Sequence, residues 1–378
     1  MAAPLPFGLT AAVPAWLAQH VPELTPPVTI TRLAGGRSNL TYLVTDAAGV
    51  RRVLRRPPLG AREATAHDVL REARLLAGLA GQVPVPAVLA VCTDTSVTGA
   101  PFIVLEYLEG VVLRDPPSVE AALPPPQRRQ VGPALIDAMV ALHEVDPTRV
   151  GLGGLAARRD HVARQLRRWY GNWQRTRTRE LPDLEAAYHR LAERVPKQRR
   201  SCVVHGDFRL DNCVLSSSVT VRGILDWELA TVGDPLVDVG QFLVYWAEPG
   251  DEQTALYAPP TRAPGFSRRD ELIARYCAAT GEDPAAIDYY VAFSWWRTAC
   301  IVEDVYTRTR RGAMGITDRS PESFADQAAA LAARARHAAA RLRSPRRRAV
   351  SPGRFRSAGR LGAVSDDLAE EGTPPRVP

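Results

Sequence analysis

The stretch His205-Gly206-Asp207-Phe208-Arg209-Leu210-Asp211-Asn212 has the spacing H-x-D-x-x-x-x-N, and Asp226 follows Asn212 by fourteen residues in the run Ile224-Leu225-Asp226-Trp227. Apolar residues flank both runs, with CVV before His205, VL after Cys213 and GIL before Asp226. Such flanks predict short strands with polar residues at their ends. A carboxylate held in an apolar framework is expected to be functional.

Three side chains in these runs fit the needs of phosphoryl transfer, which requires few protein groups. A carboxylate must accept the proton of an attacking hydroxyl, and oxygen ligands must hold the magnesium ion that neutralises the phosphates. We therefore expect Asp207 to be the base, and Asn212 and Asp226 to be the magnesium ligands.

Two other interpretations fit part of the pattern. In the first, Asp and Asn residues only cap turns between strands; the H-x-D start and the second strand-borne Asp argue against it. In the second, His205 and Asp207 belong to a hydrolytic metal site. That site lacks a second histidine cluster, because the remaining six His residues are dispersed.

Upstream of the motif, the sequence predicts a small antiparallel sheet. VTITRL, LTYLV and VRRVLRR are β-rich runs separated by AGGRSN and by the turn signal DAAG. Apolar spacing predicts helices over 9–20 and 61–79, and VPAVLAVC and PFIVLEYL predict two further strands.

Downstream of this sheet, the chain becomes mainly helical. Residues 109–126 are rich in Pro and acidic residues and are expected to be a linker, and helices are expected over 130–142, 161–173 and 183–195, and again from Asp238 to about Leu342. The fold class is therefore α+β. The predicted divisions are an N-terminal helix (1–27), a sheet region (28–109), a helical region (110–342) and a disordered tail (343–378).

The composition of the 378 residues, with 46% hydrophobic and 24% charged, predicts a globular protein. Five scattered cysteines without metal-ligand spacing favour a reduced, cytoplasmic protein. No secretory signal and no membrane-spanning run is expected. The net charge of +7 is diffuse, which argues against nucleic acid as a partner, although an arginine-rich tail (343–356) leaves that alternative open.

The chain resembles the aminoglycoside phosphotransferase and choline kinase superfamily, and most of all the kinase-like domains fused to some acyl-CoA dehydrogenases. The matching stretches run from about Leu33 to Arg297: GGRSNLTYLV, VLRRPP, REARLL, VPVP, RQLRRW, TRELPDL, VVHGDFRLDN, ILDWELATVGDPLVDVG and SWWR. The resemblance implies a bilobal protein-kinase-like fold, ATP and Mg²⁺ as cofactors, and transfer of the γ-phosphoryl group to a hydroxyl of a small molecule.

Carried over by position, the resemblance also implies nucleotide-binding residues. The turn holding Gly35, Gly36, Ser38 and Asn39 would cover the phosphates, because glycines allow close backbone approach. A cation is expected on the third strand. The only lysine of the chain is Lys197, far downstream, so Arg55 takes this position; strand alternation places Val53 and Arg55 on one face and Arg56 on the other.

Six further residues receive roles in the same way. Glu72 would be the helix partner of Arg55, and backbone groups from Glu106 to Leu108 would bind adenine. Glu228 lies on the same face as Asp226 by strand alternation, and would assist the metal or substrate or form a structural ion pair. Asp238 is expected to cap a helix and brace the catalytic loop, and His205 to hold that loop by hydrogen bonds.

The acceptor is the least determined part of the prediction. Arg164, Arg167 and Arg168 lie beside Trp169 and Trp173; either they extend outward from a core helix, or they bind an anionic substrate, which by resemblance would be a hydroxyacyl-coenzyme A. The basic excess argues against a polycationic antibiotic, although an aminoglycoside or macrolide acceptor stays an alternative. A pseudokinase that binds nucleotide without turnover is the rival prediction. ATP or GTP as the donor and the oligomeric state are left open.

Overall fold

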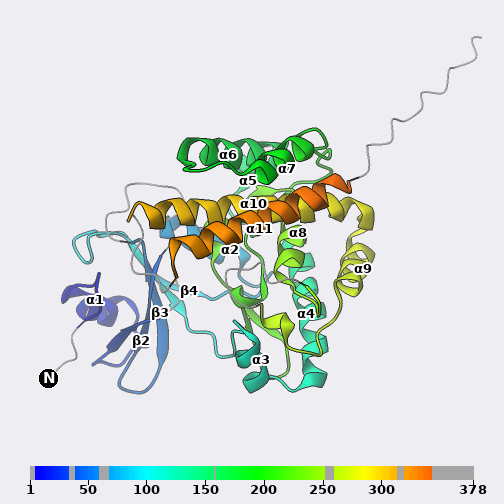
Figure 1. Ribbon diagram of the computed structural model, residues 1–378. Helices are drawn as coiled ribbons and strands as arrows, with labels where there is room; N and C mark the ends of the chain where they lie inside the picture. Colours follow the sequence, from blue (N-terminus) through cyan, green and yellow to red (C-terminus); the bar gives the residue numbers. More distant parts are fainter. Residues whose placement is uncertain are drawn as a thin grey trace, which may run out of the picture. The chain divides into compact units, whose positions relative to one another are not determined.

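The computed structural model describes residues 5–33, 39–58, 68–156, 159–251, 259–312 and 319–342. The described residues belong to one compact unit (Figure 1). They form a five-stranded antiparallel sheet followed by a larger, mainly helical region, which confirms the expected α+β, bilobal, protein-kinase-like architecture. The residue at which one lobe ends and the next begins stays a prediction.

The sheet has the strand order β1-β2-β3-β5-β4, and a helix follows its third strand. Alternate residues of β2 are buried, as expected for a strand with one covered face. The elements of this region are α1 (Ala12–His20), β1 (Thr29–Arg32), β2 (Leu40–Thr45), β3 (Arg51–Arg56), α2 (Val69–Leu79), β4 (Val88–Cys92) and β5 (Phe102–Glu106).

The two faces of the sheet contribute to different cores. Phe102 and Val104 of β5 pack with Val13 and Leu17 of α1, whereas the intervening residues of β5 pack with α2 in a core that continues into the helical region. Asp68 starts α2 by accepting a hydrogen bond from the Arg71 N–H at 2.9 Å. The second face therefore holds α2, and the charged residues it carries, against the helical lobe.

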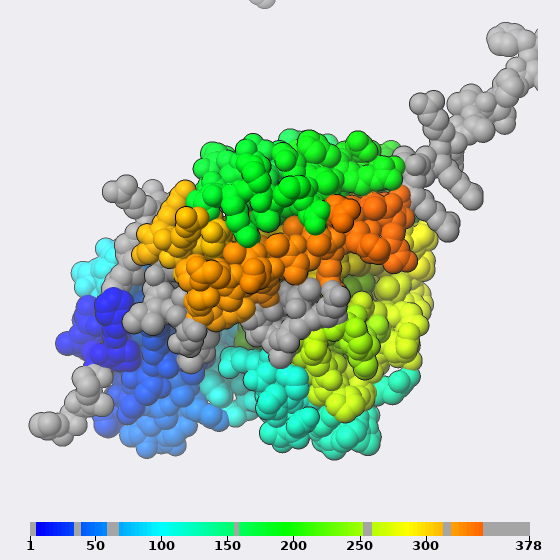
Figure 2. Space-filling model, viewed as in Figure 1, coloured from blue at the N-terminus to red at the C-terminus, as the bar shows by residue number. Residues whose placement is uncertain are grey.

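The helical lobe surrounds two short β-ribbons, β6–β9 and β7–β8. In Figures 1 and 2, the green helices α6 and α7 lie over the yellow and orange α10 and α11. The elements are α3 (Pro116–Ala122), α4 (Pro125–Glu144), α5 (Gly153–Ala156), α6 (His161–Thr176), α7 (Pro182–Ala192), β6 (Cys202–Val204), β7 (Cys213–Leu215), β8 (Val221–Ile224), β9 (Thr231–Gly233), α8 (Leu236–Tyr245), α9 (Arg269–Thr280), α10 (Pro284–Arg310) and α11 (Pro321–Ala340).

The expected linker over 109–126 was wrong, because it contains α3 and the start of α4. Prolines in this stretch begin helices instead of interrupting them: Pro116 and Pro125 each occupy the first helical position, where the missing N–H costs nothing. Asp115 and Ser118 complete a capping box at α3. The predicted tail, 343–378, and residues 61–67 of the predicted second helix lie outside the described residues.

Helices α8 and α10 approach each other closely at Gly240. A Cβ atom there would lie 2.4 Å from the backbone oxygen of Tyr290, so no larger residue fits without separating the helices. The adjacent Gln241 and, two turns along α10, Arg297 both face the site described below. Among the described helices, none combines the length and apolar character needed to span a bilayer; the cytoplasmic location stays a prediction.

His161, at the start of α6, is buried and accepts a hydrogen bond on Nδ1 from the Asp234 N–H at 3.2 Å. Burial, together with the nearby Arg164, lowers its pKa to about 4. The unfolded chain, with an ordinary histidine pKa near 6.5, binds the proton more tightly. The stability due to neutral His161 is therefore fully present above about pH 6.5, and is lost as the pH falls toward 4.

We predict that the free energy of unfolding decreases by about 2 kcal/mol between pH 7 and pH 5 because of His161. Urea denaturation at both pH values measures the free energy of unfolding. In His161→Gln the decrease of about 2 kcal/mol that is due to His161 should be absent. His189→Gln, at an exposed position, should keep the wild-type decrease. Equal pH dependence in all three proteins would contradict the assignment.

Candidate active site

The loop after β6 is held by a single buried carboxylate. Asp238, fully buried in the first turn of α8, accepts the His205 N–H at 2.7 Å and the Gly206 N–H at 2.8 Å. Burial alone would raise the pKa of Asp238, but the hydrogen bond and charge of His143 outweigh it and hold the pKa below its usual value. The expected contact with the loop is present, whereas the expected helix cap is wrong, since Pro235 occupies the N-cap position.

His205 links this loop to the residue before Asp226. Its Nδ1 accepts the Asp207 N–H at 3.2 Å, and its Nε2 lies 2.9 Å from the Leu225 carbonyl oxygen. This pairing needs a neutral ring with the proton on Nε2. Gly206, between His205 and Asp207 in the sequence, has φ 82° and lies against Leu229. Both features require a residue without a side chain at this position.

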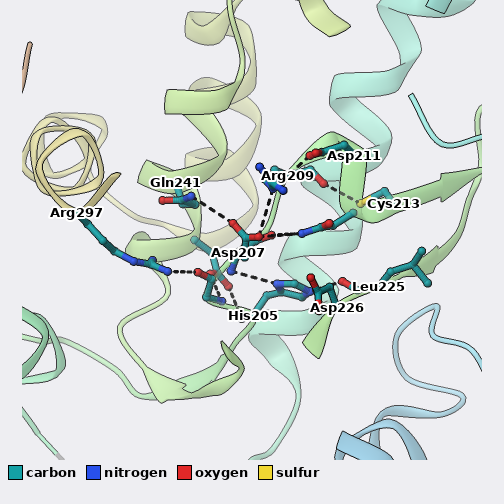
Figure 3. Close-up of polar contacts among 12 residues, drawn as sticks. His205, Asp207, Arg209, Asp211, Cys213, Leu225, Asp226, Gln241 and Arg297 are labelled. Atoms are coloured by element: carbon teal, nitrogen blue, oxygen red, sulfur yellow. Dashed lines mark hydrogen bonds and ion pairs between the residues drawn. The ribbon is translucent and has the colours of Figure 1, made fainter. Parts of the chain in front are cut away.

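The Asp207 carboxylate is oriented from three sides (Figure 3). Asn212 Nδ2 lies 3.1 Å from its Oδ2, Arg209 Nε lies 3.3 Å from the same oxygen, and Gln241 Nε2 lies 3.4 Å from Oδ1. These three donors hold both oxygen atoms of the carboxylate. The structure therefore presents Asp207 as a carboxylate of fixed orientation.

Two residues of this network, Arg209 and Gln241, had no role in the sequence-based prediction. Arg209 also pairs with Asp211 at 3.3 Å, and Arg297 of α10 donates to the Gly206 carbonyl oxygen at 2.6 Å. Arg209 lies inside the motif and Arg297 inside the stretch SWWR, so a local signal existed for both. Gln241 had none, because only the packing of α8 brings it to Asp207.

Arg55 is surrounded by carboxylates. Its Nε lies 3.0 Å from Glu72, and its Nη2 lies 2.6 Å from Asp226 and 3.7 Å from Glu228. Burial would lower the pKa of Arg55, but Glu72 and Asp226 outweigh it and raise the pKa. Burial raises the pKa of Glu72 despite the opposing charge of Arg55. The expected partner of Arg55 is therefore in contact with it.

Strand alternation explains the direction in which the Arg55 side chain points but not the position of Asp226. Val53 and Arg55 share a face as expected, and Arg56 is buried on the opposite face, where it donates to the Gly8 carbonyl oxygen. Asp226 instead has φ 68° and precedes a 3-10 turn over Trp227–Leu229. Asp226 and Glu228 thus reach Arg55 from a turn, so the strand-based reasoning for this pair was wrong.

A cavity of about 380 Å³ opens beside this cluster. Arg55, Glu72 and Asp226 border it on one side, and Glu106 and Leu108 border it on another, with apolar residues between them (Val53, Leu105, Val214 and Leu225). Five of the predicted nucleotide-binding and metal-binding residues thus share one cavity. Its size and mixed lining are those of a small-ligand site.

The predicted phosphate-covering turn is only partly visible. Asn39 is buried at the start of β2, and its Oδ1 has no hydrogen-bond partner among the described residues. Gly35, Gly36 and Ser38 lie outside the described residues.

Comparison with known proteins identifies the family. A model of the Phosphotransferase enzyme family (APH) matches residues 29–290. The chain belongs to this family. Mouse acyl-CoA dehydrogenase family member 10 is 33% identical over 76% of this chain and 27% of its own length, and the probable acyl-CoA dehydrogenase IBR3 of Arabidopsis thaliana is 32% identical over 77% and 38%. The chain thus spans about a third of these relatives.

Solved structures agree with this family. A putative aminoglycoside phosphotransferase from Ralstonia eutropha superimposes with a TM-score of 0.72 at 28% identity, over 88% of this chain and 98% of that one. The macrolide 2'-phosphotransferase type I, at 22% identity and a TM-score of 0.58, shows the shared fold alone. The predicted resemblance and enzyme class are confirmed: the protein is a small-molecule phosphotransferase.

The oxygen atoms beside the cavity suit a hard cation. The Asn212 amide nitrogen is used by Asp207, which leaves its amide oxygen for a ligand. The Leu225 N–H donates to the Asn212 carbonyl oxygen at 2.8 Å, so the next residue, Asp226, lies beside Asn212. Within the described residues, no group of three or more His, Cys, Asp or Glu could enclose a metal. The Asn212 amide oxygen and the Asp226 carboxylate form a set of two oxygen ligands. Such a set fits Mg²⁺, which takes few protein ligands and completes its shell with water and phosphate.

Replacing Arg55 by Met should strongly destabilise the phosphotransferase, because Glu72 would be left buried without its cation. We expect a loss of about 3 kcal/mol in the free energy of unfolding by urea denaturation, and recovery of much of it in the double variant Arg55→Met/Glu72→Gln. Arg52→Met is the control, since Arg52 pairs at 3.5 Å with the exposed Glu23 and should cost less than about 1 kcal/mol. Similar losses in both single variants would contradict the coupling.

Proposed function

We propose that this phosphotransferase moves the γ-phosphoryl group of ATP to a hydroxyl group of a small molecule with the help of Mg²⁺. The observation that carries the proposal is the oriented Asp207 carboxylate in contact with Asn212, together with Asp226, which borders the cavity directly after Leu225, the residue bonded to the Asn212 backbone. One structural neighbour was solved with ADP and hygromycin B, and another with GDP and kanamycin.

In this proposal, Asp207 accepts the proton of the attacking hydroxyl. Gln241 and Arg209 hold its two oxygens from different sides, so that the carboxylate does not rotate away from the acceptor. Such positioned acid–base groups contribute about 10²–10⁴-fold to a rate. Arg297 fixes the backbone before Asp207 by its bond to Gly206.

Arg55 would donate to the phosphates of the nucleotide while Glu72 keeps its guanidinium in place. The planar fork of arginine donates to two oxygens in a fixed bidentate geometry, whereas the ammonium of a lysine acts as a point charge. The Asn212 amide oxygen and the Asp226 carboxylate would hold Mg²⁺, which when bound neutralises phosphate charge. Backbone groups from Glu106 to Leu108 would receive adenine, since both residues border the same cavity.

Asp207→Ala should reduce phosphoryl transfer by about 10²–10⁴-fold, because the proton acceptor is lost. ATP affinity should stay within about threefold, since the side chain does not border the nucleotide cavity. ADP release with and without acceptor measures phosphoryl transfer, and calorimetric titration of the protein with ATP and Mg²⁺ measures ATP affinity. Asp137→Ala, in an exposed pair with Arg275, is the control.

Unchanged turnover in Asp207→Ala would contradict the assignment of the base. ATP binding in the wild type without transfer to any acceptor would instead support a pseudokinase. The acceptor panel should contain hydroxyacyl-coenzyme A esters, aminoglycosides, macrolides, sugars and choline.

For the acceptor, we propose a hydroxyacyl group carried on coenzyme A. Arg164 and Arg168, one turn apart on α6, lie close enough to Arg297 and His161 to lower the pKa of these groups. In the part of the chain that the structure describes, none of Arg164, Arg167 and Arg168 forms an ion pair with a carboxylate. Unpaired cations beside a phosphotransferase loop suit the phosphates of coenzyme A. The two relatives reported above are named as acyl-CoA dehydrogenases, so their names refer to acyl groups on the same carrier.

Removing the phosphates from the carrier should weaken the acceptor. We expect the KM for a hydroxyacyl-pantetheine to exceed that for the matching hydroxyacyl-coenzyme A by about tenfold, because charged hydrogen bonds are lost. In Arg164→Ala/Arg168→Ala, the two KM values should converge, whereas Arg190→Ala on α7 should leave them apart. Equal KM values for both esters in the wild type would contradict this acceptor.

A further inference from the structure

A second cavity, of about 230 Å³, lies between α6 and α10, outside the residues assigned so far. We call it the indole cavity, because two tryptophans form much of its wall. Its volume is that of roughly seven or eight water molecules in the liquid, so it suits a single ring or a short chain. The lining residues are Trp169, Asn172, Trp173, Thr176, Cys300 and Asp304.

Trp173 supplies an unused hydrogen-bond donor in this wall. The residue is only 3% exposed, and its indole Nε1 has no hydrogen-bond partner among the described residues. Buried indole N–H groups normally find a partner, because leaving one unpaired is costly. An occupant with an oxygen atom at this point would satisfy it.

The rest of the wall favours a neutral, apolar occupant. Burial raises the pKa of Cys300 well above its usual value, so this side chain is a neutral thiol. Asp304 is paired with Arg308 at 2.9 Å, which offsets its charge. The Thr176 hydroxyl donates to the Asn172 carbonyl oxygen at 3.0 Å and is thereby occupied.

Arg297 connects the indole cavity to the catalytic loop. Its guanidinium donates to the Gly206 carbonyl oxygen at 2.6 Å and lies 5.9 Å from the ring centre of Trp169. Cys300 and Asp304 follow Arg297 on α10 by about one and two turns, so these two lining residues lie about 5 and 10 Å along the helix from Arg297. A molecule with its hydroxyl at Asp207 would have to extend past Arg297 by a comparable length to place another part in the cavity.

We propose that the indole cavity binds the apolar end of the phosphoryl acceptor, with the Trp173 N–H donating to an oxygen atom on that end. The effect of the indole cavity on turnover rests on the proposed function. The cavity would select acceptors that carry a short apolar chain or one ring beyond the reacting hydroxyl. A polyhydroxylated or polycationic group would be disfavoured, because the walls offer few acceptors and no unpaired carboxylate.

The first test needs neither nucleotide nor turnover. Cyclohexanone, a ring with one carbonyl oxygen, is titrated into the ¹⁵N-labelled full chain while the indole N–H signals of its seven tryptophans are followed. The signals of Trp169 and Trp173, assigned by their loss in Trp→Phe variants, should shift saturably. In Trp173→Phe, cyclohexanone should bind about three- to tenfold more weakly, measured at Trp169. Trp295→Phe, a residue outside this cavity, should bind as the wild type does.

The second test connects the cavity to the acceptor. Asn172→Phe and Cys300→Phe each fill part of the space, and thermal denaturation shows which of them is folded. In a folded variant, the KM for hydroxyacyl-coenzyme A esters that carry a short apolar chain or one ring beyond the hydroxyl should rise by about tenfold, while esters without that group keep their kcat and KM. Absence of a saturable shift with cyclohexanone, or equal effects on esters with and without the apolar group, would overturn the proposal. An inactive wild type with saturable cyclohexanone binding would overturn the proposed function instead.

Discussion

The hydrogen bonds from two loop amides to Asp238 are the interaction on which the rest of the site depends. They fix His205 and Gly206 at the end of β6. His205 then reaches Leu225, and Asp207 is left where groups from α8 and the loop itself can orient it. A carboxylate that is buried and still charged needs all its oxygen atoms satisfied. The loop amides, with His143, meet that requirement, so the stability of the core and the geometry of the site are linked.

Local patterns in the sequence predicted the sheet, most helices and the central motif, because these depend on spacing along the chain. The face of Arg55 followed from strand alternation, and its contact with Glu72 is present. The turn at Asp226 could not be predicted, because apolar and polar alternation carries no signal for a positive φ at an aspartate. Gln241 was missed for a related reason: its place beside Asp207 is set by the contact of Gly240 with α10, a long-range feature without a local signal.

The acceptor side that we propose lies mainly on two helices, α6 and α10, and α6 differs in character along its length. The first half of α6 carries arginines close to Arg297, and its second half carries the two indoles. One helix can thus offer charge and apolar surface to different parts of one molecule. Sequence reasoning left two interpretations of the tryptophan and arginine cluster open, because both place the same residues on the same helix and differ only in what the arginines contact.

The use of arginine at position 55 has a consequence for chemical labelling. Reagents that acylate amines attack the neutral form of a lysine, and the guanidinium of an arginine is not deprotonated in proteins. The chain has one lysine, Lys197, and it does not border the cavity beside Arg55. Nucleotide-derived acylating reagents therefore have no amine to modify in that cavity. Labelling by such reagents would not report whether a nucleotide occupies this cavity.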